Sequence, residues 1–362
     1  MTIDRVRADH YRIPLPTVLS DATHGDITHF ELITVRLDAR DGAEGVGYTY
    51  TVGAGGAAIR ALIERDLAPV LAGADDDGIE ALWERMWWRL HYVGRGGLAS
   101  FAISAVDVAL WDLAARCRGL PLWRHAGGHD SRVRAYAGGI DLQFSLDRLL
   151  RQTDENRARG FRAIKMKVGR TRLSEDVERV REMRALLGPD TPLMVDANMR
   201  WTADEAIRAA RALAPHDIYW LEEPTIPDDV PGHVRIVRDG GLPVATGENF
   251  RTLHEFERMM EAGGVTFPEP DVSNCGGVTV WMKVAHAAEA RNLPVTSHGV
   301  HDLHVHLLAA VPNASYLEVH GFGLERFIAH PIVLQDGLAI APERPGHGVD
   351  LDWKALESLR AA

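Results

Sequence analysis

The sequence has few cysteines and no long apolar run. Of its 362 residues, only Cys117 and Cys275 are cysteines, and they lie in unrelated contexts, so neither a disulfide framework nor a cysteine zinc site is expected. The first residues lack the apolar core of a signal peptide, and no uninterrupted apolar run reaches the ~20 residues that span a bilayer. We therefore expect a protein of the reducing cytoplasm that does not contact a membrane.

Basic residues are also too few for a typical nucleic-acid-binding protein. The chain has 40 Lys and Arg against 51 Asp and Glu, which gives a formal net charge of −11 at pH 7. Because no basic cluster is present to bind phosphates, we expect no nucleic-acid partner. Hydrophobic residues make up 46% of the chain, enough at this length for the core of a barrel domain and a smaller one.

Two patterns of expected elements divide the chain. In residues 1–125 the strand-like runs come first and the helix-like runs follow, which indicates an α+β unit. Residues 126–325 alternate strand-like and helix-like segments, which predicts a (β/α)8 barrel. Residues 326–362 are irregular and rich in Pro and Gly, and we expect this tail to return toward the first unit. The eight barrel runs are VRAYAG, RAIKMKV, PLMVDA, IYWLEE, LPVATGE, VTFPEPD, LPVTSH and SYLEVH.

Charged and ionisable side chains recur at the ends of these runs. From Lys167 to Glu318 they lie 20 to 29 residues apart, about the length of a strand, a helix and two connections. In a closed parallel barrel the carboxyl ends of all strands open onto one rim, so these side chains would converge. The residues concerned are Lys165, Lys167, Asp196, Glu222, Glu248, Asp271, His298 and Glu318.

Asp196, Glu222 and Glu248 predict a metal site. Three carboxylates at neighbouring strand ends repel one another and lose hydration unless a cation compensates. An all-oxygen set favours a hard divalent ion, Mg²⁺ first and Mn²⁺ as a substitute. The alternative is three unrelated surface acids, which their regular spacing after apolar runs disfavours.

Lys165 and Lys167 predict a base. Residues two apart on a strand point to the same face, so both ammonium groups would enter the barrel mouth. Mutual repulsion and partial burial are expected to lower the pKa of one lysine, which could then take a proton from carbon. The alternative is a pair of exposed lysines on an edge strand, but a closed barrel has no edge.

Asp271, His298 and Glu318 complete the predicted site. An aspartate that accepts a hydrogen bond from one imidazole nitrogen leaves the other nitrogen free to act as base or acid. A lone histidine at a strand end is more often structural, but the aspartate one repeat upstream favours catalysis. A protonated Glu318 could donate a hydrogen bond to a developing enediolate oxygen.

Together these motifs resemble the enolase superfamily, and within it the mandelate racemase subgroup. The resemblance rests on the KxK motif of Lys165 and Lys167, the three acids that follow it, and the Asp, His and Glu at the ends of the last three runs. It implies a modified (β/α)8 TIM barrel, an N-terminal α+β capping domain and a C-terminal segment that completes the cap. It also implies a homo-oligomer, and a small-molecule carboxylate substrate that is bound to Mg²⁺ and contacted by Asn198.

The resemblance further implies a mechanism through an enediolate, formed by abstraction of the proton α to the carboxylate. Lys167 is then one base, and Lys165 tunes it and contacts the carboxylate. His298, oriented by Asp271, is the second acid or base on the opposite face. Glu318 corresponds to the electrophilic acid of the family.

The choice of substrate depends on two candidate capping loops, residues 19–28 and 48–56. Their polar side chains indicate a cap that binds hydroxyl groups, which favours a polyhydroxy acid over an aromatic 2-hydroxy acid. Asp21 and His24 are equally compatible with a solvated loop. The polar side chains of these loops include Asp21, Thr23, His24, Tyr48 and Tyr50, and all of these except Tyr48 are candidate substrate-binding residues.

The stretch from PLMVDAN to YLEVH is most similar to acid-sugar dehydratases of the talarate/galactarate type. We therefore predict a Mg²⁺-dependent dehydratase, a carbon–oxygen lyase that converts an aldonate or aldarate into a 2-keto-3-deoxy acid. A racemase or epimerase of a 2-hydroxy acid and a lactone cycloisomerase remain open, because one enediolate serves all three reactions.

Two hypotheses come from other classes. His304 and His306 form an HxH motif, as in metal-dependent hydrolases, but they lie in a late helix-like run where packing or surface positions are expected. A carbohydrate-binding scaffold without activity is disfavoured, because a binding protein needs no pair of opposed bases. Glu269 has no assigned role, and a histidine near His298 could share its proton transfer. These neighbours are His301, His304, His306 and His320.

Overall fold

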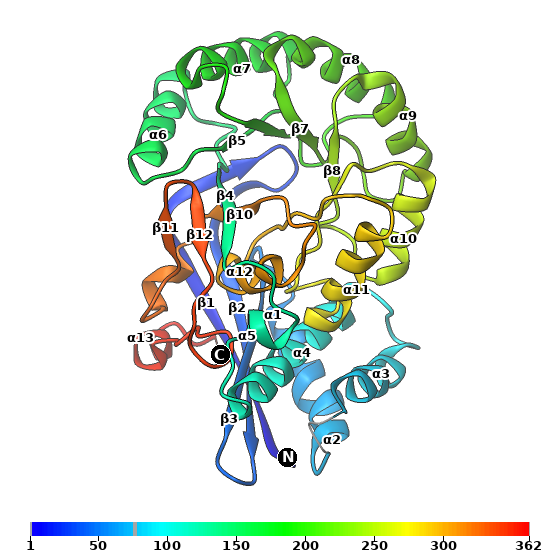
Figure 1. The fold of residues 1–362 in the computed structure, drawn as a ribbon, viewed down its shortest axis with the longest axis vertical. Helices are drawn as coiled ribbons and strands as arrows, with labels where there is room; N and C mark the ends of the chain where they lie inside the picture. The colour runs from blue at the N-terminus through cyan, green and yellow to red at the C-terminus, as the bar shows by residue number, and fades with distance from the viewer. Residues whose placement is uncertain (1, 75–77, 362) are drawn as a thin grey trace.

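The N-terminal part of the chain is a three-stranded antiparallel sheet followed by helices; the structure, a computed structural model, describes residues 2–74 and 78–361 (Figure 1). Alternate residues of the middle strand enter two different cores, with Ile33 and Val35 against the helices and Phe30 and Leu32 in the larger core. The elements are β1 (Ile3–Asp21), β2 (Gly25–Ala39), β3 (Glu44–Thr51), α1 (Gly56–Leu62), a π-helical turn (Ile63–Leu67), α2 (Ala68–Leu71), α3 (Ile79–Leu90) and α4 (Leu98–Cys117).

Helix α4 joins this part to the rest of the molecule. It packs directly on β3, because a Cβ atom at Gly47 would lie only 2.1 Å from the carbonyl oxygen of Ala105. By length and composition α4 could cross a membrane, yet 83% of its most apolar window is buried inside the protein, as in a core helix. On the other side, the buried Asp107 accepts hydrogen bonds from the backbone N–H and the hydroxyl of Thr279, at 2.9 and 2.7 Å.

The predicted (β/α)8 barrel is confirmed. Its parallel strands pair in the order β4 to β9, and β10 pairs with β4 (Figure 1). The strands are β4 (Arg132–Gly138), β5 (Ile164–Lys167), β6 (Leu193–Asp196), β7 (Ile218–Glu222), β8 (Val244–Thr246), β9 (Phe267–Pro268) and β10 (Leu317–His320). The helices are α5 (Leu122–His125), α6 (Leu146–Ala158), α7 (Leu173–Leu187), α8 (Ala203–Leu213) with a 3₁₀ turn (Ala214–His216), α9 (Val230–Gly240), α10 (Leu253–Ala262), α11 (Gly277–Glu289) and α12 (His301–Ala310).

The seventh predicted strand, LPVTSH, is reduced to a single bridge. Val295 is bridged to Ala314, and its carbonyl accepts the N–H of Ser315 at 2.7 Å. On the other side, Thr296 donates its N–H to the carbonyl of Pro268 at 3.0 Å. These hydrogen bonds close the barrel, although too few consecutive residues pair to make a strand.

The C-terminal tail contacts both the barrel and the N-terminal sheet. Its hairpin, β11 (Val333–Gln335) and β12 (Leu338–Ile340), adds β12 antiparallel to β4 and was not anticipated from the sequence. A 3₁₀ turn (Leu324–Phe327) precedes the hairpin and α13 (Trp353–Glu357) follows it. The chain then reaches β1, where Ala361 donates its N–H to the carbonyl of His10 at 2.8 Å.

Candidate active site

Strand register brings the first predicted site residues together. Lys167 on β5 is paired with Asp196 on β6, and Asp196 with Glu222 on β7, so these three occupy neighbouring strand ends. Lys165 lies two residues earlier on the same face of β5. Glu248 follows the end of β8 and completes an arc of charged side chains at the carboxyl end of the barrel.

The three predicted metal ligands form one buried cluster. Asp196, Glu222 and Glu248 each offer a carboxylate oxygen within 4.8 Å of those of the other two. The backbone N–H of Asn198 donates to Asp196 Oδ1 at 2.8 Å, and Trp220 Nε1 donates to Glu222 Oε2 at 3.0 Å. Among the described residues, no group donates a hydrogen bond to the buried Oε2 of Glu248. The donor set and its spacing fit a hard divalent cation such as Mg²⁺.

The two lysines also lie in this cluster. Lys165 Nζ binds Glu222 and lies 2.7 Å from Glu318 Oε1, while Lys167 Nζ binds Asp196. Burial opposes protonation of both lysines, but the carboxylates outweigh it and raise the pKa of each. Among the protein groups alone, attraction to the carboxylates exceeds the repulsion between the two ammonium groups, so this shift is opposite to the one predicted, and a lowered lysine pKa stays a prediction for the site with its cation.

Asp271 and His298 form the predicted pair. His298 Nδ1 lies 3.1 Å from Asp271 Oδ2, and Nε2 faces the acid cluster at 3.3 Å from Glu248 Oε2. Asp271 also accepts hydrogen bonds from the N–H and the hydroxyl of Ser273, at 2.8 and 2.7 Å, which fixes its orientation. Burial lowers the pKa of His298, but the charge of Glu248 and the hydrogen bond to Asp271 outweigh it and raise the pKa to about 10.

Glu318 lies at the same mouth, beside Lys165. Its Oε2 accepts the backbone N–H of Gly299 at 3.0 Å, and its Oε1 contacts Lys165. Burial favours the neutral acid, but Lys165 outweighs burial and holds the pKa of Glu318 well below its usual value. This shift is opposite to the one that a protonated Glu318 would need, because the ammonium group of Lys165 lies against the carboxyl group.

The first candidate capping loop is the tip of the β1–β2 hairpin, which reaches the barrel mouth (Figure 1). The hydroxyl of Thr23 donates to the backbone carbonyl of Asn198, close to the acid cluster. Asp21 accepts the N–H of Thr23 at 2.8 Å and lies 2.8 Å from His24 Nδ1. Burial disfavours the charged imidazole, but its stronger hydrogen bond to Asp21 raises the pKa of His24.

The second candidate capping loop begins later than expected. Tyr48 and Tyr50 belong to β3, where they are paired with Thr34 and Leu32 of β2, and both tyrosines are buried. Their expected loop position is therefore wrong, because the sheet pairing continues through Thr51. The hydroxyl of Tyr50 donates to Asp271 Oδ2 at 3.2 Å, so this side chain still reaches the site.

An aromatic cluster beside His298 was missed from the sequence. Phe322 stacks on Phe30 with ring centroids 5.6 Å apart, and it contacts Tyr50 edge-on at the same distance. His320 packs against Phe322 at 4.7 Å. Tyr50 was a candidate from the sequence, and His320 carried a signal because it follows Glu318 by two residues and therefore shares its face of β10. Phe30 and Phe322 carried none. The cap is thus more apolar on this side than expected.

Two further buried acids adjoin the cluster. Glu223, which follows the ligand position 222, accepts hydrogen bonds from Asn249 Nδ2 at 2.8 and 3.0 Å. Glu269 is fully buried, and neither of its carboxylate oxygens has a hydrogen-bond partner among the described residues. Burial, reinforced by neighbouring carboxylates, raises the pKa of both side chains well above the usual value.

The HxH motif does not form a metal site. His304 accepts the N–H of Val272 at 3.0 Å and lies 3.0 Å from the carbonyl of Gly299, so both ring nitrogens are engaged by backbone. His306 is buried as well, and its Nε2 lies 2.9 Å from the carbonyl of His347. Both are packing residues as expected, but they are buried rather than on the helix surface.

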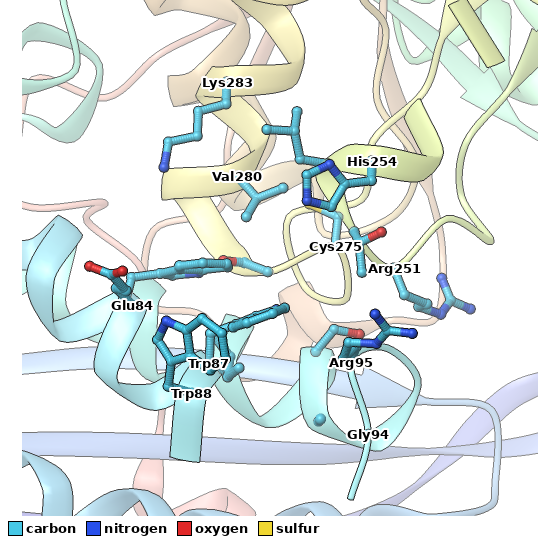
Figure 2. A pocket seen from close by; sticks show the side chains of 17 residues that line it. Glu84, Trp87, Trp88, Gly94, Arg95, Arg251, His254, Cys275, Val280 and Lys283 are labelled. Carbon is cyan, nitrogen blue, oxygen red and sulfur yellow. The ribbon is translucent and has the colours of Figure 1, made fainter. Parts of the chain in front are cut away.

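A cavity of about 290 Å³ lies outside the barrel mouth, between α3, α4 and the barrel (Figure 2). Figure 2 shows Trp87 and Trp88 on one side, and His254 and Val280 on the other. Arg251 connects this cavity to the acid cluster, because it lines the cavity and its Nη1 donates to the backbone carbonyl of residue 248 at 2.6 Å.

Comparison with known families identifies the architecture. Residues 3–127 match the N-terminal domain of mandelate racemase and muconate lactonizing enzyme, and residues 148–355 match the enolase C-terminal domain-like family. The chain belongs to the enolase superfamily. Within it, the chain is a member of the mandelate racemase subgroup, as the motifs predicted.

Individual members of the superfamily are similar over nearly the whole chain. A 3,6-anhydro-alpha-L-galactonate cycloisomerase of Streptomyces coelicolor is 58% identical over 99% of this chain and 99% of its own. An L-talarate/galactarate dehydratase of Salmonella typhimurium is 34% identical over 95% of this chain and 87% of its own. The crystal structure of a racemase from Streptomyces coelicolor A3(2) with bound magnesium has a TM-score of 0.98 at 57% identity, covering 99% and 100% of the two chains.

Proposed function

We propose that this chain is a Mg²⁺-dependent cycloisomerase that opens the ether ring of a 3,6-anhydro-aldonate. The observation that carries the proposal is the 58% identity to the anhydro-galactonate cycloisomerase over 99% of both chains. The dehydratase expected from the sequence takes second place, because the talarate/galactarate dehydratase is only 34% identical. A small-molecule carboxylate substrate, a homo-oligomer and a cytoplasmic location stay part of the proposal.

The proposed reaction is an elimination that loses no atoms. A base removes the proton at C2, the C3–O bond breaks, and its electron pair stays on the ring oxygen. That oxygen takes up a proton and becomes the C6 hydroxyl group. The C2–C3 enol then takes a proton at C3 and releases its hydroxyl proton, which gives a 2-keto-3-deoxy acid. Product and substrate are isomers, whereas a dehydratase would release water.

Residues at the mouth supply each part of this reaction. Asp196, Glu222 and Glu248 would hold the ion, which stabilises the negative charge that develops on the substrate carboxylate. Lys167 and His298 approach from different sides of this cluster. A cation at the three acids would offset the carboxylate charges that raise the pKa of both side chains, so that one can take the C2 proton and the other can supply the proton for the leaving oxygen.

The aromatic cluster supports a compact cyclic substrate. An open-chain aldarate carries a hydroxyl on each inner carbon, and each buried hydroxyl needs a hydrogen-bond partner. Beside His298 the mouth offers instead the rings of Phe30, Tyr50 and Phe322, which suit the C–H surface of a small ring. At the hairpin tip, Asp21 and His24 are already engaged with each other.

The test is turnover of the purified chain with Mg²⁺ on 3,6-anhydro-L-galactonate and on a panel of aldarates and aldonates, run in D₂O. We expect a keto acid of the mass of the anhydro substrate apart from deuterium, and slow or absent water loss from the panel. A Lys167→Met variant, similar in length without the ammonium group, is the matched control and should be inactive. Keto acid from aldarates alone would favour the dehydratase, and deuterium at C2 without keto acid an epimerase.

A further inference from the structure

His320 is a buried imidazole that the roles described so far leave without a function. It is 9% exposed, and Nδ1 is buried with no hydrogen-bond partner among the described residues. Nε2 lies 3.8 Å from Glu318 Oε2, which is too long for a hydrogen bond. An unsatisfied buried polar ring is destabilising, so its presence calls for a group that binds it in another state of the protein.

The surroundings of His320 indicate where that group would lie. Its ring centroid is 5.8 Å from that of His298, and Phe322 packs against it edge-on at 4.7 Å. Because His320 and Glu318 share one face of β10, the imidazole lies at the mouth between the predicted base and the aromatic cluster. A ligand atom there would lie close to the part of the substrate that exchanges a proton with His298.

The ring is neutral in this environment. Burial lowers the pKa of His320 to about 3, against the attraction of Glu318, and the charges of His298, His301 and Lys165 act in the same direction as burial. A neutral imidazole has one N–H donor and one acceptor nitrogen. It can therefore hold an oxygen by a hydrogen bond without giving up its own proton.

We propose that His320 is the residue that binds the ring oxygen leaving C3, an inference that rests on the cycloisomerase function proposed above. As the C3–O bond breaks, negative charge develops on this oxygen, and the imidazole N–H donates a hydrogen bond to it. The proton that completes the C6 hydroxyl comes from Lys167 or His298, and His320 stays neutral throughout. Stabilisation of this kind acts on the bond-breaking step and leaves removal of the C2 proton unaffected.

The experiment compares two rates in D₂O with Mg²⁺ and 3,6-anhydro-L-galactonate: deuterium incorporation at C2 of the recovered substrate, and formation of keto acid. His320→Phe keeps a ring of similar shape but removes the donor, and His320→Asn keeps an N–H near the position of Nδ1. We expect His320→Phe to lose ring opening by ~10²-fold, as for loss of one oxyanion donor, while C2 exchange persists. His320→Asn should recover part of the loss.

A control variant tests whether packing explains the result. Phe322→Leu disturbs the same cluster without touching a hydrogen bond, so it should raise KM and leave the ratio of ring opening to exchange unchanged. Ring opening by His320→Phe at the wild-type rate would overturn the inference, and so would an equal loss of both rates. A wild-type chain that opens no anhydro ring would instead overturn the proposed function, and this inference with it.

Discussion

The buried Asp107 of α4 should make the stability of the fold depend on pH. Burial raises the pKa of Asp107 from its ordinary value of 3.8 to about 7, although hydrogen bonds from Thr279 act in the other direction. An acid with a raised pKa binds its proton more tightly in the folded chain than in the unfolded one. Its contribution is therefore most favourable below about pH 4, falls as the pH rises to about 7, and is constant above that.

The magnitude follows from the two pKa values. A difference between 3.8 and about 7 corresponds to about 4 kcal/mol of unfolding free energy lost at high pH. Asp107→Asn keeps the shape and cannot ionise, so it should abolish this loss. We expect the free energy of unfolding of Asp107→Asn, relative to the natural chain, to be about 3 kcal/mol greater at pH 8 than at pH 5.

The assay is urea unfolding followed by tryptophan fluorescence at a series of pH values, because the difference between two variants cancels the titration of all other groups. Asp190→Asn, at an exposed position, is the matched control and should differ from the natural chain by less than ~0.5 kcal/mol at every pH. A difference for Asp107→Asn that stays flat between pH 5 and pH 8 would refute the reasoning, since Asp107 would then be ionised in neither or both states at each pH.

Three further predictions concern the site. Asp271→Asn removes the partner of His298 and should lower ring opening by ~10²–10⁴-fold, measured as keto acid formation, with a wild-type thermal midpoint excluding a folding defect. Mg²⁺ at 100 times its Kd should stabilise the chain by about 2.7 kcal/mol in calorimetry, and Glu222→Gln should remove most of this gain; an unchanged gain would place the ion elsewhere. His306→Ala should lower stability by ~2–4 kcal/mol, because it opens a cavity and frees a buried carbonyl, yet leave Mg²⁺ binding by calorimetry unaltered.

The barrel and the positions of its charged side chains could be predicted because the relevant information is local. Each strand is predicted by its own run of apolar residues, and Asp196 and Glu222 directly follow two of those runs. Strand pairing then converts similar positions in sequence into neighbours in space, whatever the intervening helices contain. LPVTSH is the exception: its composition is that of a strand, but only one of its residues forms a bridge.

The protonation states could not be predicted, because they depend on distances between segments. No acid lies next to Lys165 in the sequence RAIKMKV. In the fold, Glu222 and Glu318 contact it and reverse the expected shift of its pKa. Tyr50 was misplaced for a related reason. Where a strand ends depends on how far its partner continues, and β2 pairs with β3 up to residue 51.

The position of Arg251 bears on how such enzymes diversify. Its guanidinium donates to the backbone carbonyl of Glu248 while lying 5.1 Å from the ring centroid of Phe101 on α4, and Trp83 of α3 donates to the carbonyl of Gly276 at 2.8 Å. Phe101 of the N-terminal domain thus contacts the arginine that binds the backbone at Glu248. A chimera that grafts a relative's N-terminal domain onto this barrel would lose the contact to Arg251 unless an aromatic ring stood at the position of Phe101. Substitutions on α4 and in the segment after β8 are therefore constrained to change together where Phe101 meets Arg251.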